Sequence, residues 1–589
     1  MSLNKETRYA LDYHEATKHS EASLLTSRHY LDFDNKPLPF KIYIETPSIS
    51  LPTSFPTPQV NALSCISGIT NKGLNDESEV LTSALGTKAT TKSTDAIKNI
   101  PYVDVSSLAE ILFFSAGITR EIKYSYGKYY MRAASATGAL YPIELYVVCD
   151  DISPNLNAGV YHFSPADFSL TEIRKGNYKK YLATAAVAAN NRDVARSPIA
   201  IIFTSIAWRN AWKYQARSYR HWFWDSGVIA ANLLATTHAM GLPTHIIIGF
   251  LDDEISQLLS LEDQIEAPIA IAAIGKGSQK NVIVSSQQQG GDKIPHIPVP
   301  NIRPLSKSGE INYPEIWALN QASKLTSIQE IEEWIGIAHR RKPLLSAVPH
   351  HAPRNGPNNE SSLIVTSGDL QENVKASRSL KETILWRGSS RKFARSNIAF
   401  SALKTILYSS TRGVPLDILK NEEDSLIDIY FLANAVDGLT PGAYFYNRNT
   451  SATNPNTSVV RVKEVVTSRN ISGYLCLGQA LFSDASVVFF LMTDLQSVLG
   501  SLGNRGYRSS QFEAGVIAGK IYLAAYALGI GASGSTFFDD AVTEFFSPHA
   551  SKKSAMIAVG VGVPAYSAKP GKILPTRLSK EQLLTQNFG

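Results

Sequence analysis

Short apolar runs alternate with helical patterns along most of the chain. Between about Ser106 and Ser115 apolar residues recur at i, i+3 and i+4, which predicts a helix that Gly117 ends. The runs LYPIELYVVCD, GVYHFS and SPIAIIFTSI predict three strands. Asp225 to Met240 predicts a long helix that is apolar on nearly every side, and THIIIGF and APIAIAAIGKG predict two further strands. This irregular alternation of helices and strands indicates an α+β layer fold.

The same plan occurs twice. The stretch 218–253 recurs as 506–540, and Gly227 and Gly515 hold the same place in the two stretches, 288 positions apart. The second copy has SALKTILYSS as its first helix and LIDIYFLAN, GAYFYN, ASVVFFLMTD and SAMIAVGVGVP as strands. A repeat this long is not a solenoid unit, so we expect a covalent pseudo-dimer with a ligand site at its internal interface.

The repeat divides the chain into four parts. Residues 1–80 predict an irregular N-terminal extension with the motifs YHEATKHS and PLPFKIY, and residues 81–284 form the first copy. Residues 285–378 predict a linker that contains one amphipathic helix, SIQEIEEWIGIAHR, and a loop at 350–362. Residues 379–589 form the second copy.

Composition narrows the class of protein. The net charge of +6 is small for 589 residues, and without a basic stripe it does not favour a nucleic-acid partner. Cys65, Cys149 and Cys476 are far apart and fit no metal-binding spacing, so we expect reduced thiols and no metal site. The polar start of the sequence and the absence of a long apolar run predict a soluble, cytoplasmic protein without membrane contact.

Two segments have the composition of a ligand site. WRGSSRKF places Arg387, Ser389 and Arg391 just before an apolar helix, where guanidiniums, hydroxyls and free amides could bind a phosphate. The same residues also fit an exposed basic turn. RAASATGALYP holds small residues against which a flat ligand could lie, with Ser135 and Thr137 as hydrogen-bond donors, although such a segment also fits an ordinary turn.

A third segment could supply acid–base chemistry. In WKYQARSYRHW, Lys213 stands beside Tyr214, and burial together with nearby arginines could tune the pKa of either group. A surface cluster of cations and aromatic rings is the structural alternative.

Together these motifs resemble the nitroreductase superfamily. The resemblance rests on RGSSRKF, R-x-x-S-x-x-G-A-L-Y-P-x-E-L-Y, K-Y-x-x-R-x-Y-R and the helix DSGVIAANL, and it covers about 103–277 and 380–564. Within the superfamily, the chain is similar to the SagB/ThcOx branch, which includes the FMN-dependent azoline oxidases. The resemblance implies two tandem nitroreductase-like domains that pair as FMN-binding dimers do.

The two copies retain complementary halves of the FMN site that the resemblance implies. The phosphate would lie on the second copy, and the ring would lie against the first. The second interface site, which lacks both halves, is predicted to be empty, so we expect one FMN per chain. The implied cofactor-binding residues are Arg387, Ser389, Arg391 and Arg577 for the phosphate, Arg132, Ser135, Ala136 and Thr137 for the ring, and the backbone of Ser533 and Gly534 on the other side of the ring.

The resemblance implies an FMN-dependent oxidoreductase that acts on a C–N bond of a small-molecule or peptide substrate. Lys213 and Tyr214 would assist removal of a proton as a hydride goes to the flavin. An NAD(P)H-dependent nitro- or quinone reductase is one alternative. A non-catalytic scaffold or peptide-binding subunit, with YHEATKHS docking a partner, is another. A further homodimer stays open.

Overall fold

The computed structural model describes most of the chain. The described residues are 2–54, 60–68, 103–125, 127–186, 192–276, 294–342, 364–365, 373, 376–421, 424–448, 457–465, 467–572, 578–586 and 588.

The first copy is built on a seven-stranded antiparallel sheet with the strand order β1-β6-β5-β4-β7-β9-β8. A two-stranded hairpin of β2 and β3 stands apart from this sheet. The strands are β1 (Ser48–Ser50), β2 (Ile118–Tyr124), β3 (Gly127–Arg132), β4 (Ile143–Cys149), β5 (Gly159–Ser164), β6 (Ser169–Lys175), β7 (Ile199–Ile206), β8 (Thr244–Ile247) and β9 (Glu266–Ile274). The helices are α5 (Val105–Ala116), α6 (Lys179–Ala185), α7 (Arg192–Arg196), α8 (Ala207–Tyr214), α9 (Ser218–Ala239) and α10 (Asp252–Leu259).

The second copy repeats this sheet with the order β10-β13-β12-β11-β14-β16-β15. Its strands are β10 (Ile364–Val365), β11 (Asp428–Ala433), β12 (Gly442–Asn447), β13 (Thr457–Glu464), β14 (Val487–Thr493), β15 (Gly531–Ser535) and β16 (Ser554–Gly562). Its helices are α14 (Leu380–Trp386), α15 (Phe400–Thr411), α16 (Ser468–Leu475), α17 (Ala480–Asp484), α18 (Leu495–Ala527), α19 (Asp539–Phe546) and α20 (Lys580–Thr585). The predicted α+β fold with two copies is therefore confirmed.

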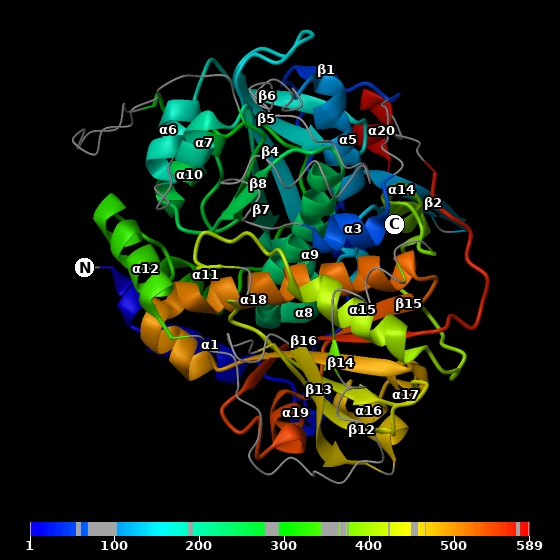
Figure 1. Cartoon of the computed structure of the whole chain (residues 1–589). Helices are drawn as coiled ribbons and strands as arrows, with labels where there is room; N and C mark the ends of the chain where they lie inside the picture. The colour runs from blue at the N-terminus through cyan, green and yellow to red at the C-terminus, as the bar shows by residue number, and fades with distance from the viewer. Residues whose placement is uncertain are drawn as a thin grey trace, which may run out of the picture.

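The long helices α9 and α18 lie between the two sheets and cross each other (Figure 1). They touch through glycine. A Cβ added at Gly227 would lie 2.6 Å from the carbonyl carbon of Gly515, and one at Gly515 would lie 2.7 Å from the carbonyl oxygens of Phe223 and Trp224. Because the two glycines hold equivalent places in the repeat, the crossing lies on the pseudo-twofold axis and leaves no room for a side chain.

Reciprocal ion pairs join the copies on both sides of this axis. Arg217, directly before α9, and Arg220 on α9 bind Asp539 of the second copy at 2.9 and 2.7 Å. Arg505 and Arg508, which hold the equivalent places on α18, bind Asp252 of the first copy at 2.5 and 2.7 Å. All six side chains are buried. Burial raises the pKa of both aspartates, but their arginine partners outweigh it and hold the pKa below its usual value.

The predicted irregular N-terminal extension is wrong in one respect, because this segment contains helices. They are α1 (Arg8–Ala16), α2 (Glu21–Leu25) and α3 (Ala62–Ser67), with short 3₁₀ turns η1 (Leu3–Lys5) and η2 (Phe33–Asn35). Tyr13 and His14 of the YHEATKHS motif are buried, and the Tyr13 hydroxyl donates to the carbonyl of Ala216 at 2.6 Å. The pattern of apolar residues did not predict α1, because contacts with the rest of the chain stabilise this helix.

The segment between the copies also carries more structure than a linker. The predicted amphipathic helix is present as α12 (Ile328–Arg340), and a helix that the sequence did not predict, α11 (Pro314–Ala322), precedes it. The predicted loop at 350–362 lies outside the described residues. No helix in the described ranges is both long and apolar enough to span a bilayer.

We expect Gly227→Ala to lower the free energy of unfolding by about 3 kcal/mol, because the added methyl group would overlap backbone atoms of α18. Gly500→Ala is the matched control, since a Cβ at this exposed helical position would meet nothing within 4 Å. The control should be neutral or stabilise by up to about 1 kcal/mol. Chemical denaturation of both variants measures the difference, and equal midpoints would contradict the close crossing.

Candidate functional site

One side of the internal interface brings together the two segments that the sequence singled out. From the second copy, the Arg387 guanidinium donates to the carbonyls of Ala133 and Arg132, both at 2.7 Å. From the first copy, Arg120 donates to the carbonyl of Leu385 at 2.9 Å. The loop 387–391, here named the Arg-Ser loop, therefore lies directly against the start of the small-residue turn 133–139.

A buried carboxylate holds the small-residue turn in place. Asp225 on α9 accepts hydrogen bonds from the amide of Thr137 at 2.9 Å and from its hydroxyl at 2.7 Å. Gly138 follows with φ 64°, and a Cβ there would lie 2.7 Å from the hydroxyl of Tyr214. The turn is thus fixed between α9 and the end of α8. The Thr137 hydroxyl, predicted to donate to a ligand, donates to Asp225.

Asp225 has an equivalent in the second copy. Glu513 on α18 accepts hydrogen bonds from the hydroxyl of Ser425 and from the amide of Leu426 at 2.9 Å. In both copies an acid on the long helix therefore fixes the segment that leads to a central strand. Burial raises the pKa of Asp225 to about 7, despite the opposing hydrogen bonds from Thr137 and Asn210.

A small pocket lies inside the turn. It is lined by Ala116, Arg132, Ala134, Ser135, Ala136, Tyr141, Pro142, Ile143, Asp225 and Ile229. Arg132 is buried, lies over the Tyr141 ring at 4.8 Å, and donates to the carbonyl of Pro39 at 2.5 Å. Its Nε is buried with no hydrogen-bond partner among the described residues. Burial lowers the pKa of Arg132 to about 10.

Lys213 and Tyr214 lie at the C-terminal end of α8, next to this turn. The Lys213 ammonium is 5.3 Å from the centre of the Tyr214 ring, and the edge of the His221 ring packs against Tyr214 at 4.6 Å between centroids. Burial and the charge of Arg391 lower the pKa of Lys213. Burial and the charge of Asp225 raise the pKa of Tyr214. The lowered pKa makes the Lys213 amine less basic, and the raised pKa keeps the Tyr214 phenol protonated at neutral pH.

Residues of the second copy complete the surroundings. The Ser389 hydroxyl lies 3.5 Å from the hydroxyl of Tyr522, which accepts the amide of Gly534. Arg391 is exposed, and its guanidinium has no hydrogen bond or acid partner among the described residues. Ser533 is buried on the same edge strand, β15. Of the predicted site residues, Arg577 lies outside the described residues.

The equivalent position on the other side of the axis is crossed by the chain itself. Ile246 on β8 holds the place that Ser533 holds on β15. Its amide donates to the carbonyl of Pro415 at 2.9 Å, and its carbonyl accepts the amide of Asp417 at 3.0 Å. The helix α12 covers this contact, because a Cβ added at Gly249 would lie 3.3 Å from the Trp334 ring.

Sequence patterns missed several residues of the site. Asp225 carries no local signal beyond its place on an apolar helix, and Tyr522 and Arg120 are brought in by the fold. A buried acid at equivalent places in both copies, Asp225 and Glu513, was the one signal that could have pointed to such a role.

The nitroreductase family model matches residues 95–276 and 440–563, together just over half of the chain. A nitroreductase-like protein of Methanocaldococcus jannaschii, MJ1384, is 28% identical over 169 residues, which cover 29% of this chain and 79% of that protein. The microcin B17-processing protein McbC of Escherichia coli is 24% identical over 141 residues, 23% of this chain and 52% of McbC. The trifolitoxin-processing protein TfxB of Rhizobium leguminosarum bv. trifolii is 28% identical over 164 residues, 27% of this chain and 44% of TfxB.

The matches therefore span only about half of the two processing proteins. Among solved structures, a nitroreductase-like protein from Anabaena variabilis aligns with 94% of this chain and 99% of its own, with a TM-score of 0.64 and 22% identity. At that identity the likeness shows the fold alone, and the alignment extends over both copies.

The raised pKa of Asp225 predicts a pH effect on stability. Because the folded-state pKa of about 7 exceeds the ordinary value of 3.8, the contribution is fully present below about pH 4 and is lost as the pH rises through 7. Asp225→Asn should flatten the fall in the free energy of unfolding between these pH values. Asp253→Asn, at an exposed carboxylate, is the control and should leave the slope unchanged. Parallel curves for the wild type and Asp225→Asn would contradict the assignment.

Proposed function

This chain belongs to the nitroreductase family, and we propose that it is an FMN-dependent oxidoreductase with one composite flavin site per chain. The observation that carries the proposal is the junction of the Arg-Ser loop of one copy with the small-residue turn of the other, held by Arg387. Each half comes from the copy that retained it, and neither half is complete alone.

The residues present at the junction fit a flavin mononucleotide. The guanidinium of Arg391, without a partner among the described residues, and the hydroxyl of Ser389, 3.5 Å from that of Tyr522, suit a phosphate. The Nε of Arg132, which no described residue bonds, and the small residues Ser135 and Ala136 suit the polar edge of a flat ring. Arg387 would support the phosphate site by holding the loop, since two of its donors bond the first copy. The amide of Gly534 donates to the hydroxyl of Tyr522, which in turn lies near Ser389. Ser533 directly precedes Gly534 on β15.

FMN, when bound, supplies a two-electron acceptor, and the protein contributes position and acid–base groups. Lys213 is suited to remove a proton from the substrate, because its lowered pKa leaves a larger share of the amine uncharged. Tyr214 is suited to donate a hydrogen bond, because its raised pKa keeps the phenol protonated. Asp225 holds the turn beside Tyr214 and keeps Gly138 against its hydroxyl.

We propose a substrate with an oxidisable C–N bond, either a small molecule or a peptide. The similarity to the SagB/ThcOx branch and to two peptide-processing proteins supports the peptide form of this proposal. A non-catalytic scaffold that docks a partner through YHEATKHS is less well supported, because Tyr13 and His14 are buried inside the chain.

We expect the purified protein to release about one FMN per chain, since the chain itself fills the equivalent position at Ile246. Arg391→Gln should weaken FMN binding by at least about tenfold, because it removes a charge-assisted contact to phosphate. Lys392→Gln makes the same change of charge on the neighbouring exposed residue and should bind FMN as the wild type does. Flavin absorbance after release gives the count. Two FMN per chain, or equal loss in both variants, would contradict the composite site.

Lys213→Ala should abolish oxidation of a thiazoline-containing peptide while FMN stays bound, because the base is lost and the phosphate contacts are kept. Lys36→Ala is the control, since this lysine is close enough for the charge of Lys213 to lower its pKa but belongs to the N-terminal segment. Steady-state turnover and the flavin spectrum are measured together. Unchanged turnover would remove the assignment of Lys213, and rapid bleaching of the flavin by NAD(P)H would favour a nitro- or quinone reductase.

A further inference from the structure

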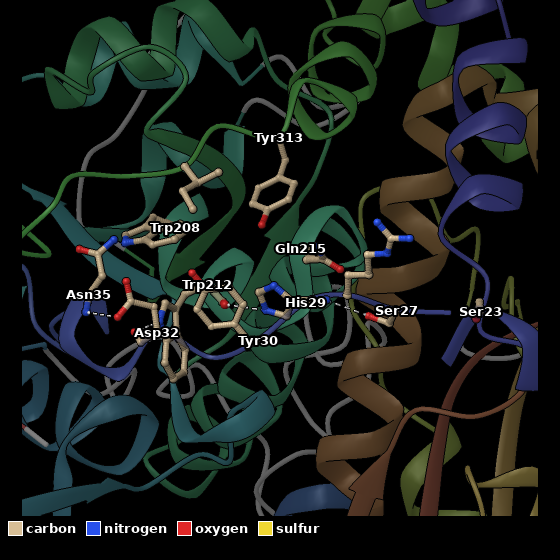
Figure 2. A pocket seen from close by; sticks show the side chains of 12 residues that line it. Ser23, Ser27, His29, Tyr30, Asp32, Asn35, Trp208, Trp212, Gln215 and Tyr313 are labelled. Carbon is tan, nitrogen blue, oxygen red and sulfur yellow. Dashed lines mark hydrogen bonds between the residues drawn. The ribbon is translucent and has the colours of Figure 1, made fainter. Parts of the chain in front are cut away.

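A cavity of about 590 Å³ lies against Trp208 and Trp212 on α8 (Figure 2). It opens to the surface and is bordered by α8, by the N-terminal segment 23–35, and by the segment 311–313 after the first copy. A cavity of this size is in the range that holds a small organic ligand. Neither the flavin site nor the proposed acid–base pair uses it.

Two tryptophans and two tyrosines form part of its walls. Trp208 and Trp212 stand one turn apart on α8, and Tyr30 and Tyr313 face the same opening from the other two segments. The indole nitrogens already have hydrogen-bond partners in the chain. Trp212 donates to the carbonyl of Asp32 at 2.8 Å, and Trp208 donates to the hydroxyl of Ser306 at 3.1 Å. The rings therefore offer the cavity their apolar surfaces, which favour a flat aromatic ligand.

Among the described residues that line the cavity, Arg28 is a charged side chain whose guanidinium has no polar contact with another described residue. The Asp32 carboxylate accepts the amides of Asp34 and Asn35 at 3.1 and 3.3 Å, and the His29 ring bonds the carbonyl of Trp212 at 3.1 Å. Arg28 has neither a hydrogen bond nor an acid partner among the described residues. A ligand that enters the cavity therefore meets an available guanidinium, which pairs best with a carboxylate.

Gln215, which lines the cavity, has a strained backbone conformation. Its φ and ψ are 49° and −142°, a conformation that is ordinarily reserved for glycine. The equivalent residue in the second copy is a glycine, Gly503, with φ 65° and ψ −161°. The backbone thus turns in the same way in both copies, but only the first copy places a side chain there, and that side chain lines the cavity and bonds Tyr313.

We propose that this cavity is a binding site for an aromatic carboxylic acid, with the ring between the tryptophans and tyrosines and the carboxylate on Arg28. The site is separate from the proposed flavin site, so binding does not require FMN. Trp212 directly precedes Lys213 on α8, so the cavity borders the helix that carries the residue proposed as the base.

Calorimetric titration of the full-length protein tests the charge first. Indole-3-acetate should bind at least about tenfold more tightly than its neutral isostere indole-3-acetamide, because only the acid pairs with the guanidinium. Arg28→Gln should bring the two affinities together. Arg8→Gln, at an exposed arginine on α1 that pairs with Asp12, should keep the difference. Equal affinities in the wild type, or no saturation by the acid up to roughly 10 mM, would overturn the proposal.

Gln215→Gly tests the strained residue separately. Removal of the side chain should raise the melting temperature, because glycine adopts this backbone conformation freely, and it should weaken binding of indole-3-acetate at least about fivefold. Higher stability with unchanged binding would show that Gln215 is not part of the site. Loss of binding together with lower stability would assign Gln215 to the fold instead.

Discussion

The close crossing of α9 and α18 at Gly227 and Gly515 is the contact on which the rest of the molecule depends. Two backbones that touch without an intervening side chain leave little freedom in the distance or angle between the copies. The crossing brings two arginines of each copy within ion-pair distance of an aspartate of the other copy, Asp539 or Asp252. Because these charges are buried, each cluster stabilises the pairing only while its partners keep their places.

Covalent fusion allows the two sides of the interface to differ. In a dimer of identical chains, a change on one side is repeated on the other, whereas here each copy carries its own sequence. On one side, Arg387 holds the Arg-Ser loop against the small-residue turn. On the other side, the chain at Pro415 and Asp417 pairs with the edge of β8, and α12 covers it. One side thus holds the two segments of the proposed flavin site together, and the other is closed by hydrogen bonds within the chain.

The strained residue Gln215 marks a second place at which the two copies differ. The helix before it and the helix after it are present in both copies, and the second copy joins them through Gly503, which packs against the backbone of Asn4. The N-terminal segment therefore covers both junctions but in different ways. It fills the space at Gly503, and it forms one wall of the aromatic cavity at Gln215. The N-terminal segment, which lies outside the repeat, therefore makes the surroundings of the two equivalent junctions different.

The two copies, the α+β class and most strands of both sheets could be predicted from the sequence, because apolar runs and the spacing of the repeat are local signals. GVYHFS and GAYFYN, for example, coincide with β5 and β12. The sequence also pointed to the Arg-Ser loop, the small-residue turn and the Lys213-Tyr214 pair. The fold alone shows that Arg387 bonds the first copy, that Asp225 holds Thr137, and that one face of the helix α1 is buried. These features depend on pairs of groups far apart in the chain, and their burial and partners exist only once α9 and α18 have crossed.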